Sequence, residues 1–123
     1  MKTRRVYLID DDADCLTSIS FLLMACGYEC VSFSCATDFL NEVPDDAEGI
    51  VLADHRLQDG NAVSILQALR AAGQKIPLVV ISGRVEPEVA ALARSNGAAG
   101  LLQKPVTADE LTRLLDEVME SAL

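Results

Sequence analysis

Basic side chains are scarce in this sequence. The 123 residues include 10 lysines and arginines against 19 aspartates and glutamates, which gives a formal net charge of −9 at pH 7. A surface of this sign repels the phosphates of nucleic acids and of anionic lipids. We therefore expect no direct binding to nucleic acid or to a membrane, and an effect on DNA would need another domain or protein.

Long hydrophobic runs are also missing. The basic start, Met1 to Arg5, is followed by only four apolar residues before Asp10, too few for the core of a signal peptide. No stretch is long enough to span a bilayer, so we expect a cytoplasmic protein. Half of the residues are hydrophobic and 24% are charged, which is typical of a folded domain, and we expect one domain over residues 1–123.

The ligands of a zinc site are few and badly spaced. The sequence has one histidine, His55, and four cysteines, none of which forms a C-x-x-C pair. Structural zinc sites need such closely spaced pairs, so we expect none here. We interpret Cys15, Cys26, Cys30 and Cys35 as reduced, mostly buried thiols.

Short apolar runs alternate with segments of helical period. This alternation predicts an α/β fold of (βα)5 type, with a parallel sheet covered on both faces. Right-handed crossovers in a five-stranded sheet favour the doubly wound, flavodoxin-like strand order 2-1-3-4-5. The predicted strands are Val6–Ile9, Glu29–Phe33, Ile50–Ala53, Leu78–Ile81 and Ala99–Leu102.

Capping signals mark the predicted helices. They run from Asp12 or Ala13 to Cys26, from Cys35 to Glu42, from Asn61 to just before Gly73, from near Pro87 to just before Gly97, and onward from the capping box Thr107–Glu110. Asp12 and Asn61 are good N-caps, and Gly27 suits a left-handed helix end. The last helix carries Leu111, Leu114, Leu115, Val118 and Met119 at the spacing of a docked amphipathic helix.

Carboxylates directly follow two of the predicted strands. Asp10 and Asp11 come after the first strand, and Asp54 comes after the third. In the predicted strand order these two strands are neighbours at the switch point, where such folds bind ligands, so the carboxylates should meet. Clustered carboxylates repel one another, and a divalent cation relieves the repulsion. We therefore expect a metal site with oxygen ligands.

Two further strand ends carry polar groups, Ser82 after the fourth strand and Lys104 after the fifth. Together with the carboxylates they suit phosphoryl transfer. A carboxylate would be the nucleophile, a divalent cation would neutralise charge, and the hydroxyl and ammonium groups would bind the remaining phosphoryl oxygens.

With these motifs the sequence resembles the receiver domain of bacterial two-component response regulators over its whole length. The motifs are VYLIDDD at 6–12, VLADHRL at 51–57, VVISG at 79–83 and QKP at 103–105. The resemblance implies that Asp54 is the phosphoacceptor. It also implies that Asp11 binds Mg²⁺ directly, that Asp10 assists through water, and that the backbone carbonyl of Arg56 is a further ligand.

The same resemblance implies the remaining roles and the partners. Ser82 and Lys104 would hold the phosphoryl group, and the Lys104–Pro105 bond would be cis. The donor would be a sensor histidine kinase or a phosphotransfer protein. The domain would be a signalling module rather than an enzyme, at most catalysing its own phosphorylation and dephosphorylation. A homodimer through the face of the fifth strand and fifth helix is a further expectation.

Three positions depart from the pattern of the family. Gln58 replaces a usual proline, Ala62 a usual glycine, and Leu101 a usual tyrosine or phenylalanine. The aromatic residue normally changes its burial on activation, so Leu101 predicts an altered output switch. Arg56 and Arg84 follow Asp54 and Ser82 by two positions. There they would bind phosphoryl oxygens, or crowd the hydrolytic water, or remain solvated surface charges.

Two other functions are open at this stage. A receiver-like scaffold could bind a partner without phosphorylation. A small phosphatase of the haloacid dehalogenase type could use Asp10 as its nucleophile, although Asp54 would then have no role. We interpret His55 as a packed or exposed loop residue, Asp12 as a helix cap, and Asp14 as a solvated acid in the first helical turn.

Overall fold

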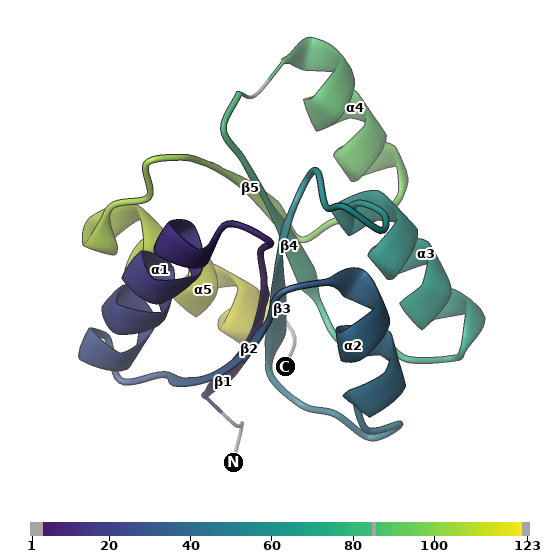
Figure 1. The fold of residues 1–123 in the computed structure, drawn as a ribbon, viewed down its shortest axis with the longest axis horizontal. Helices are drawn as coiled ribbons and strands as arrows, with labels where there is room; N and C mark the ends of the chain where they lie inside the picture. The colour runs from purple at the N-terminus through teal and green to yellow at the C-terminus, as the bar shows by residue number, and fades with distance from the viewer. Residues whose placement is uncertain (1–3, 85, 122–123) are drawn as a thin grey trace.

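The computed structural model describes residues 4–84 and 86–121 (Figure 1). Five parallel strands form one sheet in the order β2-β1-β3-β4-β5, which confirms the predicted fold class and strand order. The strands are β1 (Arg5–Ile9), β2 (Glu29–Phe33), β3 (Ile50–Asp54), β4 (Leu78–Ser82) and β5 (Gly100–Gln103). The helices are α1 (Ala13–Ala25), α2 (Ala36–Glu42), α3 (Ala62–Ala71), α4 (Pro87–Ser95) and α5 (Ala108–Ser121).

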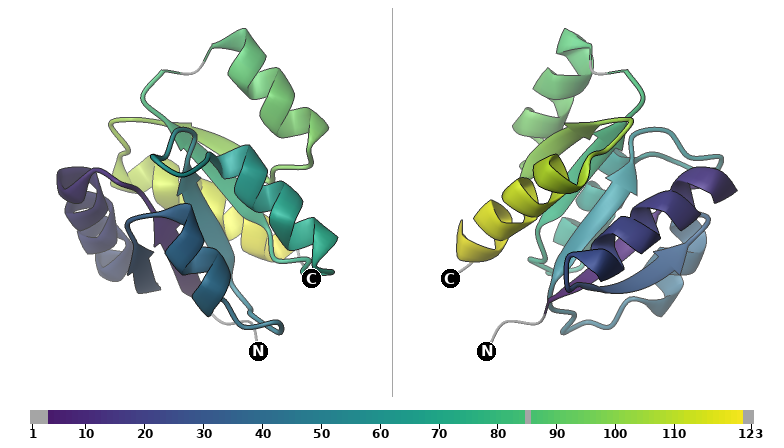
Figure 2. Two further views of the ribbon diagram at one scale, coloured as in Figure 1. Left: turned by 45° about the vertical axis from the view of Figure 1, so that its right-hand side comes forward. Right: turned by 90° about the vertical axis from the view of Figure 1, so that its left-hand side faces the viewer.

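The helices cover both faces of the sheet. Helices α1 and α5 lie on one side, and α2, α3 and α4 lie on the other (Figures 1 and 2). Successive residues of a strand point to opposite faces, and β1 divides accordingly. Tyr7 and Ile9 pack with the α2–α3 side, whereas Val6 and Leu8 pack with the α1–α5 side. This two-sided burial explains why the central strands are uninterrupted apolar runs.

The predicted caps are largely present. The carboxylate of Asp12 accepts hydrogen bonds from the backbone N–H groups of Asp14, at 2.9 Å, and Cys15, at 3.2 Å. Asn61 caps α3 in a reciprocal capping box with Ser64. At the start of α5, the Thr107 hydroxyl oxygen accepts the backbone N–H of Glu110 at 3.2 Å.

The predicted strand ends need small corrections. Strands β3 and β4 each run one residue further than predicted, and β5 begins and ends one residue later. The reason is that backbone pairing continues past the apolar side chains, as in the registers Asp54↔Ile81 and Ser82↔Gln103. A ladder of backbone hydrogen bonds does not require an apolar side chain.

The prediction of mostly buried cysteines is wrong. All four are free and only partly buried. Cys30 lies on β2, which is an edge strand of the sheet, and the fully packed residues of α1 are Ile19 and Leu23. The thiols therefore lie at the margin of the core rather than within it. Asp14 is an exposed acid in the first turn of α1, as predicted.

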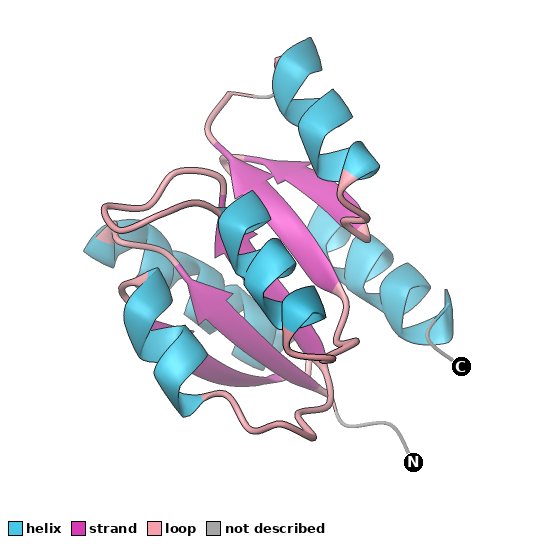
Figure 3. Ribbon diagram, turned by 90° about the vertical axis from the view of Figure 1, so that its right-hand side faces the viewer, coloured by secondary structure: helices cyan, strands magenta, loops and turns pink. Residues whose placement is uncertain are grey.

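Within residues 4–84 and 86–121, no helix has the length and apolar character needed to cross a membrane. Figure 3 shows the strands of the sheet, the helices on its faces and the loops that connect them.

Candidate functional site

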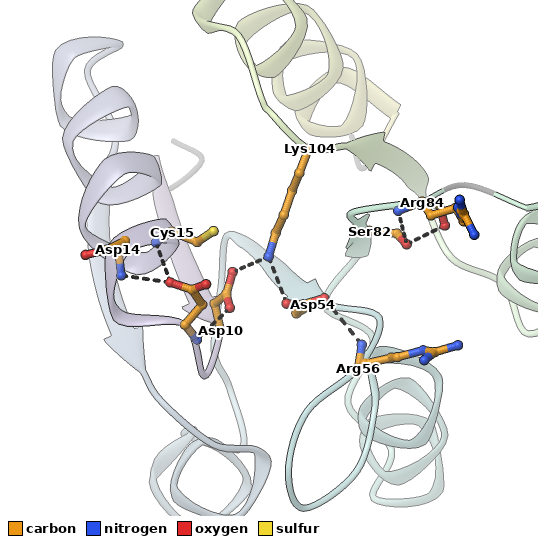
Figure 4. A network of polar contacts seen from close by, with 9 residues as sticks. Asp10, Asp14, Cys15, Asp54, Arg56, Ser82, Arg84 and Lys104 are labelled. Atoms are coloured by element: carbon orange, nitrogen blue, oxygen red, sulfur yellow. Dashed lines mark hydrogen bonds and ion pairs between the residues drawn. The ribbon is translucent and has the colours of Figure 1, made fainter.

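Lysine 104 joins two carboxylates at the carboxyl edge of the sheet (Figure 4). Its Nζ lies 2.9 Å from Asp10 Oδ2 and 2.9 Å from Asp54 Oδ2. Asp10 follows β1, Asp54 is the last residue of β3, and Lys104 follows β5. Three strand ends therefore converge on this point. The side chains of Asp10, Asp54 and Lys104 are 0%, 13% and 19% exposed. The centre therefore consists of largely buried, paired charges.

Asp10 is held rigidly from several directions. Its Oδ1 accepts the backbone N–H of Asp12 at 3.0 Å, while its Oδ2 binds Lys104. Its own backbone N–H donates to the carbonyl of Phe33 at 3.1 Å. Because the side chain is fully buried and both oxygens are occupied, Asp10 is poorly placed to attack a substrate.

Asp54 is the more accessible carboxylate of the pair. Its Oδ1 accepts only a long hydrogen bond, 3.3 Å, from the backbone N–H of Arg56. Burial raises the pKa of Asp54, and the nearby charge of Asp10 raises it further, whereas Lys104 partly opposes both effects. The environment of Asp54 therefore disfavours its ionised form, and an additional cation would stabilise the carboxylate.

Asp11 completes an acidic group of three. Asp10, Asp11 and Asp54 each offer a carboxylate oxygen, and these oxygens lie within 4.8 Å of one another. Such hard oxygen donors fit Mg²⁺, and Asp11 is the exposed member of the group. Burial opposes the charge of Lys104, but its hydrogen bonds to Asp10 and Asp54 outweigh this and raise its pKa. Lys104 thus stays charged and supplies the positive charge at this site.

The hydroxyl of Ser82 faces its own loop in this structure. It donates to the carbonyl of Arg84 at 2.8 Å and accepts the backbone N–H of Arg84 at 3.3 Å. Figure 4 shows this pair to one side of the contact between Lys104 and Asp54. The fold therefore brings four of the predicted side chains together and leaves the Ser82 hydroxyl turned to its own loop.

A cavity of about 320 Å³ lies next to the end of β3, lined by residues that include His55, Arg56, Ser82 and Arg84. His55 is half-buried, and its Nδ1 is buried without a hydrogen-bond partner among the described residues. The Arg84 side chain is 85% exposed and lies 3.8 Å from Glu86. A role for the two arginines in binding phosphoryl oxygens stays a prediction.

Two further predictions concern the end of β5. The peptide bond between Lys104 and Pro105 is cis, as expected. Leu101 is half-buried and packs against the cluster that contains Ala93 of α4. It also borders a cavity of about 230 Å³ between α4 and β5. A leucine therefore stands at the α4–β5 contact where an aromatic ring is usual.

Two residues close to the site were missed from the sequence. Cys15 lies near enough to Lys104 and Asp10 to be affected by both: burial raises the pKa of its thiol, Lys104 lowers it, and Asp10 raises it. Asp59 binds the start of α2, although it lies in the loop after β3. Neither contact has a local sequence signal, because each joins segments that meet only in the folded chain.

Comparison with known proteins places these features in a family. The family model of the response regulator receiver domain matches residues 6–116. The chain therefore belongs to the receiver domain family of two-component response regulators, which are signalling domains.

Curated relatives are consistent with this family. The transcriptional regulatory protein FixJ of Bradyrhizobium diazoefficiens is 30% identical over 117 residues, covering 95% of this chain and 57% of FixJ. The response regulator protein TodT of Pseudomonas putida is 32% identical over 106 residues, covering 86% of this chain and 47% of TodT. The chain thus spans about half the length of these two relatives.

Solved structures share the fold. Full-length FixJ from B. japonicum superposes with a TM-score of 0.90 at 29% identity, covering 99% of this chain and 60% of that one. A response regulator receiver domain protein from Clostridium thermocellum has a TM-score of 0.85 at 24% identity, covering 96% and 95% of the two chains. The second comparison bears on the fold alone.

Proposed function

We propose that this chain is a phosphoacceptor switch in which Asp54 receives a phosphoryl group in the presence of Mg²⁺. The observation that carries the proposal is the bridge from Lys104 to Asp10 and Asp54, with a third carboxylate, Asp11, within reach. In this arrangement one carboxylate is the more accessible, its partner is locked, and a cation is already present beside both.

The proposed transfer uses a carboxylate oxygen of Asp54 as the nucleophile. That oxygen attacks phosphorus, the bond from phosphorus to the donor imidazole breaks, and the imidazole leaves with its electron pair. Lys104, already 2.9 Å from Asp54 Oδ2, neutralises charge on the phosphoryl oxygens. Asp10, Asp11, Asp54 and the carbonyl of Arg56 would hold Mg²⁺, which supplies charge neutralisation to the carboxylates and to the phosphoryl group.

Ser82 would be the first residue outside the acidic group to change its hydrogen bonding when the phosphoryl group binds. Its hydroxyl now donates to Arg84, so binding a phosphoryl oxygen requires this 2.8 Å hydrogen bond to be exchanged. The exchange releases the start of the β4–α4 loop from its present conformation. We propose that this loop, α4 and the β5–α5 face form the two-state element that phosphorylation biases.

The partners belong to the same proposal. The phosphodonor would be a sensor histidine kinase or a phosphotransfer protein, and this domain would not contact nucleic acid directly. A homodimer through the β5–α5 face is proposed as a state favoured by phosphorylation. Sedimentation velocity of phosphorylated and unphosphorylated protein tests it, and equal mass in both states would contradict it. The domain boundaries at 1–123 remain a prediction.

The two alternative functions lack a supporting observation. A phosphatase would need Asp10 as the nucleophile, yet the side chain of Asp10 is 0% exposed and both of its oxygens are engaged. A scaffold without phosphorylation would need the Lys104 bridge for stability alone and would leave the third carboxylate, Asp11, without a role. The known relatives named above give neither alternative any support.

Intact-mass spectrometry after incubation with Mg²⁺ and acetyl phosphate tests the proposal. The wild-type protein should gain one phosphoryl group, and Asp54→Asn should gain none. Asp38→Asn removes the same charge from an exposed position on α2 and should label like wild type. Equal labelling of wild type and Asp54→Asn would refute the assignment of Asp54.

A further inference from the structure

Asp59, in the loop between β3 and α3, caps the N-terminus of a different helix, α2. Its Oδ1 accepts the backbone N–H of Ala36 at 2.9 Å. Its Oδ2 accepts the backbone N–H and the hydroxyl of Thr37 at 2.8 Å and 2.6 Å. The N-cap residue of α2, Cys35, makes no side-chain capping hydrogen bond of its own. Asp59 therefore supplies from a distance the acceptor that helix starts require.

These hydrogen bonds favour the carboxylate form of Asp59. The Thr37 hydroxyl, followed by the N–H groups of Thr37 and Ala36, lowers the pKa of Asp59 to about 2. The side chain is thus fully ionised near neutral pH, and the contact is a charge-assisted one at the positive end of a helix.

The start of α2 is packed in the core, whereas the loop that carries Asp59 is largely exposed. Ala36 and Phe39 of α2 are 4% and 0% exposed in the core, and the Phe39 ring lies edge-on to Phe33 at 5.5 Å. In the loop, by contrast, the side chains of Arg56, Gln58 and Asp59 are exposed. Leu57 is half-buried and packs against the same core cluster as Ala36 and Phe39, so the unpacked part of the loop is the segment around Asp59. The well-packed start of α2 can restrain that segment.

The restraint extends along the loop to the acceptor. Leu57 and Gly60 exchange backbone hydrogen bonds at 3.0 and 3.4 Å, which closes a turn that contains Asp59, the residue attached to α2. Gly60 has a φ of +156°, at the edge of the range that side-chain-bearing residues rarely adopt. Arg56 immediately precedes this closed turn, so the position of its carbonyl depends on where Asp59 is held.

We propose that Asp59 is a positioning residue for the metal site, holding the carbonyl of Arg56 in place through its contact with Ala36 and Thr37. This inference rests on the proposed function, because it takes that carbonyl to be a Mg²⁺ ligand. Gln58 cannot stiffen the turn as the usual proline ring would, and the attachment of Asp59 to α2 provides the rigidity by another route.

Isothermal titration calorimetry with Mg²⁺ compares wild type, Asp59→Asn, Thr37→Val, Thr37→Ser and Asp38→Asn. Residues that orient metal ligands typically change affinity by ~10- to 100-fold, and Asp59 acts one step further away, so we expect a Kd about fivefold to tenfold higher in Asp59→Asn. Thr37→Val should shift the Kd in the same direction by less, and Thr37→Ser should restore the wild-type value. Asp38→Asn carries the same charge change in the first turn of α2 and should bind like wild type.

The rate of phosphorylation by acetyl phosphate separates positioning from a general loss of structure. In Asp59→Asn the Mg²⁺ concentration for half-maximal rate should rise, while the rate at saturating Mg²⁺ stays within about twofold of wild type.

A lower melting temperature with an unchanged Mg²⁺ Kd in both Asp59→Asn and Thr37→Val would overturn the inference while leaving the proposed function intact. Failure of the wild-type protein to bind Mg²⁺ would instead overturn the proposed function, and this inference with it. If Asp59→Asn does not fold, the comparison of Thr37→Val with Thr37→Ser decides.

Discussion

At the scale of single residues, the environment of Asp54 disfavours its ionised form. Burial and the charge of Asp10 raise the pKa of Asp54 despite the neighbouring Lys104. A group whose pKa is higher in the folded than in the unfolded state stabilises the fold only when protonated, so its contribution is lost as pH rises through that range. Near neutral pH, an ionised Asp54 therefore lowers the stability of the metal-free protein.

We expect Asp54→Asn to melt at a higher temperature than wild type at neutral pH without Mg²⁺, by about 3 °C or more. Asparagine removes the buried charge and keeps the shape of the side chain. The difference should shrink as pH falls toward the pKa of Asp54, because wild type then becomes neutral at this position as well. Scanning calorimetry at several pH values measures it, and a lower melting temperature for Asp54→Asn at neutral pH would show that Lys104 outweighs burial.

Lys104 has the opposite effect on stability. Removing one member of a buried ion pair leaves an uncompensated charge and typically costs ~3–5 kcal/mol. We expect a destabilisation of this order for Lys104→Met in urea unfolding without Mg²⁺, because Asp10 is 0% exposed and would lose its cation. Lys75→Met, at an exposed lysine, should change the free energy of unfolding by less than about 0.5 kcal/mol.

Addition of Mg²⁺ should restore part of the stability lost in Lys104→Met, because a metal ion replaces the missing positive charge beside Asp10 and Asp54. If Lys104→Met and wild type had equal free energies of unfolding without Mg²⁺, the ion pairs of Lys104 with Asp10 and Asp54 would contribute nothing to stability.

At the scale of elements, α4 is the least firmly docked of the long helices. Ala93 is its only buried residue, while Leu92 is 47% exposed and a cavity of about 230 Å³ separates parts of α4 from β5. Helix α3, in contrast, buries five residues, from Ala62 to Leu69. Since local opening is easiest where little apolar surface is buried, we expect α4 to be the mobile element of the α4–β5 face.

Amide hydrogen exchange of the unphosphorylated protein tests this expectation. The amides of α4 should exchange at least about tenfold faster than those in the middle of α3, because opening α4 exposes less core. Similar protection in the two helices would contradict a loosely docked α4, and Leu101 would then be an adequate replacement for an aromatic ring at this contact.

The structure also shows which site features could be predicted from the sequence and which could not. The meeting of Asp10 with Asp54 was predictable, because short apolar runs and right-handed connections leave few strand orders. The rotamer of Ser82 was not, because it depends on the carbonyl of Arg84 in the following loop. The attachment of Asp59 to Thr37 joins a loop to the first turn of α2 across 22 positions of sequence, and no periodicity predicts such a contact. The cysteines were misjudged because apolar character alone does not separate the core from its margin.

At the scale of the whole molecule, the site and the α4–β5 face are linked through one loop. Ser82 is the last residue of β4 and follows Ile81, which pairs with Asp54, and the loop after Ser82 leads to Pro87, the first residue of α4. The backbone N–H of Lys104 also donates to the carbonyl of Ser82 at 2.8 Å, which ties the end of β5 to the same residue. A change at Ser82 therefore reaches both α4 and β5 without any long chain of intermediates.

The most direct measurement is a set of amide NMR spectra of the protein with Mg²⁺, before and after addition of acetyl phosphate. The account predicts large shift changes at Asp54, at residues 82–84 and along α4 and β5, none of which should occur in Asp54→Asn. Unchanged shifts in α4 and β5 in a wild-type sample that mass spectrometry shows to be phosphorylated would contradict the account. The chain would then accept a phosphoryl group without working as a switch.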